Sequence, residues 1–181
     1  RKLKPVEVAA PVRLDLGSGP NKREGFKGID ARQYDGKVDT VFDLRKTPWP
    51  WKNDSVDEVH SSHFLEHLTG AERVPFFNEL YRVLRKGAKA TIICPSWTSE
   101  RAYGDPTHQW PPVVGMSFFY LDKNWRAVNA PHVGYTCDFE FTGGPSFGPP
   151  WTLKNPEAQA FACAHYLNVV QDIICTLVAR K

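Results

Sequence analysis

The sequence predicts a single α/β domain built around a mainly parallel sheet, and three observations point to it. Short apolar runs at residues 12–16, 26–29 and 38–43 are each closed by glycine or a carboxylate. A helical pattern over residues 69–87 stands between two further strand patterns, and strands that alternate with helices favour a parallel sheet. The chain has 181 residues, which is enough for one substantial core and too few for two.

The composition is that of an ordinary soluble globular protein, with 41% hydrophobic and 24% charged residues. The net charge of +3 is only mildly basic, so it permits an anionic partner without requiring one. The four cysteines have no close spacing that would suggest zinc or a redox dithiol, and Cys94 and Cys175 are expected in the core. Because there is no signal peptide or membrane-length apolar run, we expect a cytoplasmic protein.

The first candidate site lies at the ends of the first two predicted strands. The strand at 12–16 runs into Gly17-Ser18-Gly19-Pro20, and the strand at 26–29 ends on Asp30. Glycine allows a ligand to approach the backbone closely, and ligands of open parallel sheets bind outside the carboxyl ends of the strands. A carboxylate there suits the paired hydroxyls of a ribose. The link between the strands has room for one helical turn at most.

Two other nucleotide-binding patterns fit poorly. A hydride-transfer fingerprint needs a third glycine, where this chain has Lys22, and an acid about twenty residues further on, whereas Asp30 comes much sooner. A phosphate-binding loop ending in glycine, lysine and serine or threonine is also missing. The sequence therefore disfavours both an NAD-dependent and a nucleotide-sugar enzyme.

Further along the chain, VDTVFD at 38–43 predicts a third strand that ends on Asp43, and residues 55–60 predict a fourth. Thr69 and Glu72 form a capping-box pattern that begins a helix, which Gly87 is expected to end. Residues 88–94 are apolar and predict a fifth strand buried on both faces.

These ordered motifs resemble the class I S-adenosylmethionine-dependent methyltransferases, most closely the small type 11 group. The resemblance covers residues 12–95 and is carried by LDLGSGP, GFKGID, SVDEV, a leucine-glutamate-histidine turn and FFNELYRVLRKGAKATIICP. It implies a Rossmann-like fold with a shortened first helix, an antiparallel closing strand and S-adenosylmethionine as cofactor. The cofactor-binding residues that it implies are Asp15, Gly17, Ser18, Gly19, Asp30, Ala31, Asp43, Leu44, Ser62, His63, Phe64 and His67.

Two of these assignments have alternatives. Asp43 is expected to accept a hydrogen bond from the adenine amine beside the amide of Leu44, but it could simply cap a turn. His63 and His67, with Glu66 between them, resemble a zinc pattern. Since His60 lies on a strand and His63 near its end, the rings should diverge, so no metal is predicted.

Residues 96–150 form a long segment rich in tryptophan, proline and glycine, and a segment of this kind inside a compact domain is usually functional. We expect it to bind the acceptor or to act as a lid, with a short helix at 116–121 and a strand at 139–141. A helix at 156–166 and a closing strand at 169–179 follow. Residues 1–11 are expected to be a lead-in tail, and 12–181 the methyltransferase domain.

Catalytic residues are predicted within this segment, in the Asp105-Pro106-Thr107-His108 sequence. His108 could take a proton from a hydroxyl nucleophile, with Asp105 beside it. Equally, Asp105 could form a turn with its own backbone while His108 packs on Trp110.

The predicted function is methyl transfer from S-adenosylmethionine to a small-molecule or saccharide hydroxyl or amine. DNA amino-group methyltransferases carry an Asn/Asp-Pro-Pro-aromatic run after the fourth strand, where this chain has SSHF at 61–64. This difference tilts the acceptor away from nucleic acid without excluding it. A non-catalytic module that binds the cofactor is the alternative from another class.

Overall fold

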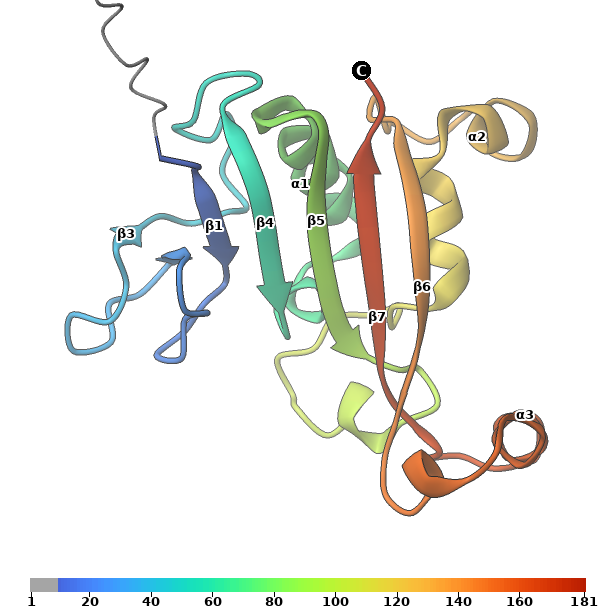
Figure 1. Ribbon diagram of the computed structural model, residues 1–181. Helices are drawn as coiled ribbons and strands as arrows, with labels where there is room; N and C mark the ends of the chain where they lie inside the picture. The colour runs from blue at the N-terminus through green and yellow to red at the C-terminus, as the bar shows by residue number, and fades with distance from the viewer. Residues whose placement is uncertain (1–9) are drawn as a thin grey trace, which may run out of the picture.

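The protein folds around one seven-stranded sheet, as a computed structural model of residues 10–181 shows (Figure 1). The predicted tail at 1–11 lies almost wholly outside the described residues. The strand order is β3-β2-β1-β4-β5-β7-β6. The strands are β1 (Arg13–Leu16), β2 (Lys27–Asp30), β3 (Thr40–Val41), β4 (Val56–Ser62), β5 (Leu84–Pro95), β6 (Phe139–Phe147) and β7 (Val170–Ala179).

Strands β1 to β5 are parallel, and β7 runs antiparallel to both of its neighbours. The predicted single α/β domain with an antiparallel closing strand is therefore confirmed. Because parallel strands end at the same edge, the segments that follow β1, β2, β4 and β5 meet there, at the lower edge in Figure 1.

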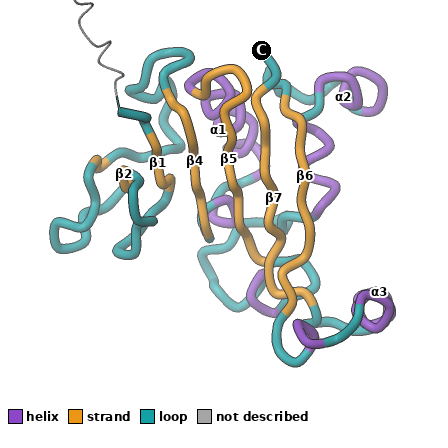
Figure 2. Tube along the Cα trace, in the orientation of Figure 1, coloured by secondary structure: helices purple, strands orange, loops and turns teal. Residues whose placement is uncertain are grey.

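The helices lie on one face of the sheet or beyond its end. They are α1 (Gly70–Val83), α2 (Lys123–Asn129) and α3 (Pro156–His165), with 3₁₀ turns η1 (Leu65–His67), η2 (Glu100–Ala102), η3 (Gly115–Leu121) and η4 (Trp151–Leu153). Figure 2 shows α1 behind the sheet and α2 beside its β6 edge, while no helix of residues 10–181 lies over the near face. The links at 17–26 and 31–39 contain only turns, so even the shortened first helix is absent.

The prediction that β5 is buried on both faces was wrong, because no helix in the described part of the chain covers the near face of the sheet (Figure 2). Ala90, Ile92 and Cys94 are fully buried, but Lys89 is exposed and Thr91 only half-buried. This alternation is the pattern of a sheet with one face in the core and one in water.

Charged side chains continue the polar character of this open face onto the neighbouring strands. Lys89 pairs in register with Glu58, and Glu58 with Arg13. The Arg13 Nε lies 3.3 Å from Glu58 Oε2. The open face is therefore polar where the three strands β1, β4 and β5 lie side by side.

Helix α1 begins as predicted and ends early. The amide of Thr69 donates to Glu72 Oε2 at 2.8 Å, and the amide of Glu72 donates to Thr69 Oγ1 at 3.2 Å, which completes the capping box. The helix ends at Val83 rather than before Gly87, because the chain from Leu84 onward pairs with β4. Gly87, with φ of +75°, lies where this pairing shifts register.

The other elements that differ from the prediction are strands whose length depends on the neighbouring strands, and one additional helix. β3 is shorter than predicted because it is an edge strand with a single neighbour, and β6 is longer because it pairs with β7 along its length. Helix α2 was not predicted, although Asp122 caps it by accepting from the Trp125 amide at 2.8 Å. No helix among residues 10–181 has the length and apolar character to cross a membrane.

Candidate active site

A pocket of about 390 Å³ lies at the carboxyl ends of β1, β2 and β4. This volume falls within the range usual for small-molecule sites. The residues that line it are Gly17, Gly19, Asp30, Ala31, Arg32, Tyr34, Phe42, Asp43, Leu44, Arg45, His63, Phe64, His67 and Leu68.

The two glycines after β1 serve different purposes. Both have positive φ, +69° at Gly17 and +53° at Gly19. A Cβ on Gly17 would lie 2.4 Å from the ring of Phe64, whereas a Cβ on Gly19 would meet nothing within 4 Å. Gly17 is thus required for packing, and a substitution there would test folding before it tested ligand binding. Gly19 keeps the backbone open toward the pocket.

The carboxylate of Asp30 is held at the pocket by two backbone amides. Oδ2 accepts from the Gly19 amide at 2.9 Å, and Oδ1 accepts from the Arg32 amide at 3.1 Å. Each oxygen keeps lone-pair capacity for a further donor. The arrangement fixes an anionic acceptor beside the glycine turn, as a ribose site requires.

Asp43 sits across the pocket, paired with its neighbour Arg45. The Arg45 Nε and Nη2 donate to the two carboxylate oxygens at 2.9 and 3.0 Å. This pairing lowers the pKa of Asp43, so the group stays ionised. The Arg45 amide also donates to Asp43 Oδ1, so the turn expected as the alternative role of Asp43 is present as well.

Three of the residues predicted to bind cofactor lie outside this lining. Asp15 is buried, accepts from the Arg23 amide at 2.7 Å, and lies 2.7 Å from His60 Nδ1. It therefore fixes the turn that follows β1. Ser18 and Ser62 do not line the pocket either, since Ser62 pairs in register with Ile93 on the open face of the sheet.

Five lining residues were not singled out from the sequence: Arg32, Tyr34, Phe42, Arg45 and Leu68. Four of them lie within four positions of Asp30 or Asp43. These four residues could therefore have been predicted from their closeness in sequence to Asp30 and Asp43, the acids at two predicted strand ends.

Next to His63, which lines the pocket, lies a polar cluster formed by His63, Glu66, Arg101 and Asp172, called the polar partition below. Arg101 Nη1 donates to Asp172 Oδ2 at 3.0 Å, and Arg101 Nη2 lies 3.5 Å from His63 Nε2. His63, at φ +55°, places Nδ1 3.3 Å from Glu66 Oε1. Glu66 raises the pKa of His63, against an opposing effect of burial.

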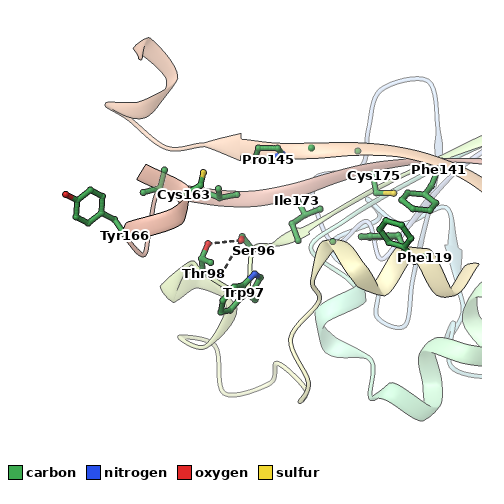
Figure 3. A pocket seen from close by; sticks show the side chains of 16 residues that line it. Ser96, Trp97, Thr98, Phe119, Phe141, Pro145, Cys163, Tyr166, Ile173 and Cys175 are labelled. Atoms are coloured by element: carbon green, nitrogen blue, oxygen red, sulfur yellow. Dashed lines mark hydrogen bonds between the residues drawn. The ribbon is translucent and has the colours of Figure 1, made fainter. Parts of the chain in front are cut away.

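A second cavity, of about 520 Å³, is formed by the segment at 96–150 and by the residues that follow it (Figure 3). Phe119 and Phe141 close one end, and Ile173 lies along its wall. The hydroxyls of Ser96 and Thr98 bond to each other at 2.9 Å. The cavity is therefore mainly apolar.

The predicted catalytic residues lie in neither space. His108 and Asp105 line a small hollow with Tyr103 and Trp110. His108 Nδ1 lies 3.1 Å from the Ala102 carbonyl, and its ring packs edge-on against His67, with centroids 4.8 Å apart. Asp105 accepts from the Thr107 amide at 2.8 Å, so the predicted turn forms.

Comparison with known proteins gives a match to one family of enzymes. A family model described as "Methyltransferase domain" matches residues 28–92. No curated protein matches the chain.

Solved structures share the fold. A SAM-dependent methyltransferase from Archaeoglobus fulgidus is 19% identical, with a TM-score of 0.68 over 93% of this chain and 86% of its own. Geranyl diphosphate C-methyltransferase from Streptomyces coelicolor, solved with S-adenosyl-L-homocysteine, is 15% identical, with a TM-score of 0.55 over 94% and 70%. Phosphoethanolamine N-methyltransferase 2 from Haemonchus contortus, solved with S-adenosyl-L-methionine, is 12% identical, with a TM-score of 0.57 over 96% and 50%. Residues 28–92 thus match a methyltransferase domain, and the chain shares the fold of solved S-adenosylmethionine-dependent methyltransferases.

Proposed function

We propose that S-adenosylmethionine lies in the 390 Å³ pocket, with its ribose on Asp30 and its adenine between Asp43 and Leu44. The open space at Gly19 and the amide-held carboxylate of Asp30 support this orientation. The methionine end then points toward His63 and His67. Their side of the pocket borders the polar partition.

We further propose that the acceptor is a small molecule with an apolar body and a hydroxyl or amine nucleophile. The observation that carries this is the mainly apolar 520 Å³ cavity, which begins at Ser96, directly after β5. Aromatic side chains dominate its closed end, and the hydroxyls of Ser96 and Thr98 bond to each other, which leaves only one of their two O–H groups free to donate to a ligand. A saccharide, which needs many hydrogen-bond partners, would leave its own groups unpaired there.

The fold supports an acceptor at this position. Ser96 directly follows β5, and His63 directly follows the neighbouring strand β4, so the cavity and the donor pocket occupy the same edge of the sheet. Asp172 belongs to the partition, while the next residue, Ile173, lines the cavity.

The chemistry asked of the protein is mainly alignment. The sulfonium of the donor is already a strong electrophile, and holding two reactants in line can supply about 7 to 11 kcal/mol in ideal cases. His108 lines neither the pocket nor the cavity, but its ring contacts that of His67 at the pocket, and it stays the predicted base if a hydroxyl reacts. Its Nδ1 donates to a carbonyl, so the lone pair is on Nε2.

The test is methyl transfer from labelled S-adenosylmethionine to three sets of compounds: apolar alcohols, phenols and aromatic amines; saccharides; and nucleic acids. We expect product only in the first set. Cys163→Phe, which adds bulk to the cavity wall, should lower kcat/KM at least tenfold while the donor Kd stays unchanged. Ala164→Phe, at an exposed neighbouring position outside the lining, is the matched control. Product from saccharide or nucleic acid alone, or none from any set, would refute the proposal.

A further inference from the structure

Two histidines and a glutamate converge at the junction of η1 with the Asp105–His108 turn. One ligand atom from each of Glu66, His67 and His108 lies within 4.8 Å of the other two. We propose that these three residues form a binding site for a divalent transition-metal cation, with Zn²⁺ as the first candidate. The sequence had predicted no metal, because the rings of His60 and His63 were expected to diverge, and His108 was not considered as a ligand.

Glu66 is the first observation in support. Its side chain is buried, and neither carboxylate oxygen has a hydrogen-bond partner. His63 contacts Oε1 only as an ion pair at 3.3 Å. A buried carboxylate without hydrogen bonds is costly, and a cation bound by it would remove that cost.

The two histidines are oriented as ligands by the groups around them. Thr107 Oγ1 donates its proton to Asp105 Oδ1 at 2.7 Å, so it can only accept from His67 Nδ1, 3.0 Å away. His108 Nδ1 likewise faces a carbonyl, that of Ala102. Both neutral rings therefore carry their lone pair on Nε2. Such outer hydrogen bonds are what fix the tautomer of metal-binding histidines.

The backbone holds the two segments together before any cation binds. The Gln109 amide donates to the Glu66 carbonyl at 2.8 Å, and Arg73 Nη1 donates to the Pro111 carbonyl at 2.8 Å. A tetrahedral zinc site, with bonds of about 2.1 Å, needs ligand atoms about 3.4 Å apart. The ligand atoms, which lie within 4.8 Å of one another, would have to move closer together when a cation binds.

Two histidines and one glutamate leave one coordination position open, as in catalytic zinc sites. His67 also lines the donor pocket, so the open position lies near the methionine end of the proposed donor site. An acceptor oxygen is a suitable fourth ligand. Since the cation uses the lone pair on His108 Nε2, metal binding and a general-base role for His108 exclude each other.

The test is Co²⁺ and Zn²⁺ binding to the full chain without a histidine tag, which does not depend on methyl transfer. We expect the protein to bind one equivalent of Co²⁺ and to show the visible spectrum of four-coordinate Co²⁺. Zn²⁺ should displace the bound Co²⁺. Glu66→Gln and His108→Gln should each weaken binding at least tenfold. The exposed His132→Gln is the matched control and should bind as the wild type does.

Folding of each variant is checked by circular dichroism without metal. If a ligand variant does not fold, Thr107→Val provides the test, because Thr107 is exposed and its replacement should not prevent folding. Loss of the hydrogen bond that Thr107 makes to His67 should weaken metal binding by about 10- to 100-fold. The proposal is overturned if the wild type shows no saturable binding. It is equally overturned if the folded variants bind Co²⁺ as tightly as the wild type.

Discussion

Asp30 is the single residue on which donor binding should depend most. It is the one carboxylate at the pocket that two backbone amides hold beside the glycine turn, and Gly19 leaves the approach to it open. A hydrogen bond to a charged group contributes about 1.5 to 3 kcal/mol, and a ribose offers two hydroxyls. The geometry is therefore preorganised for a diol.

We expect Asp30→Ala to weaken S-adenosylmethionine binding at least tenfold, since about 1.4 kcal/mol corresponds to a factor of ten. The affinity of Asp30→Asn should lie between those of the wild type and Asp30→Ala, because one acceptor oxygen remains. Calorimetry measures both dissociation constants. Asp35→Asn, in the adjacent turn where φ is +48°, is the control and should bind normally. A folded Asp30→Ala with unchanged affinity would remove Asp30 from the site.

At the scale of elements, helix α1 is connected to the donor pocket through Glu79. Its Oε2 accepts from the Trp49 amide at 2.6 Å, and Trp49 Nε1 donates to the Leu44 carbonyl at 3.0 Å. Arg82 Nε and Nη2 donate to the same carboxylate at 2.7 and 2.6 Å. The helix thereby positions the loop that carries Leu44, one wall of the pocket.

Glu79→Gln should destabilise the protein by about 1 to 3 kcal/mol at neutral pH, through loss of charge-assisted bonds. Arg82 lowers the pKa of Glu79 below its ordinary 4.5. A depressed folded-state pKa means that this stability is fully present above pH 4.5 and is lost as the pH falls through the folded pKa. Urea unfolding at a series of pH values should therefore show that the free energies of unfolding of the wild type and Glu79→Gln become equal in acid. Exposed Glu24→Gln is the control, and a pH-independent difference would contradict this account.

At the scale of the whole molecule, the donor pocket joins segments that are far apart in sequence. The segments that follow β1, β2, β3 and β4 all contribute to it, and the links at 17–26 and 31–39 contain no helix. A ligand that binds all of them stabilises the folded state as a unit.

We expect S-adenosylmethionine and S-adenosylhomocysteine to raise the Tm, and NAD at the same concentration not to. A ligand at 100 times its Kd stabilises by about 2.7 kcal/mol, which a thermal-shift measurement resolves. NAD lacks support here because Lys22 stands where the third glycine of its fingerprint belongs. A strong shift with NAD alone would argue for a hydride-transfer enzyme instead.

The sequence by itself determined the fold class, and it indicated where the pocket beside Gly19 and Asp30 lies. Both depend on local patterns: an apolar strand, a glycine turn and an acid at the next strand end, as at Gly19 and Asp30. The capping box at Thr69 is local in the same way and formed as predicted. Such features need only neighbouring residues to be recognised.

Only the tertiary structure decided features that depend on distant partners. The end of α1 at Val83 depends on pairing with β4, and the polar face of β5 depends on the helices that are missing above it. Asp15 follows the strand pattern of a ligand residue but is held by Arg23 and His60. The convergence of Glu66 and His67 with His108 arises from contacts between segments about forty residues apart in the chain, and no periodicity in the sequence encodes such contacts.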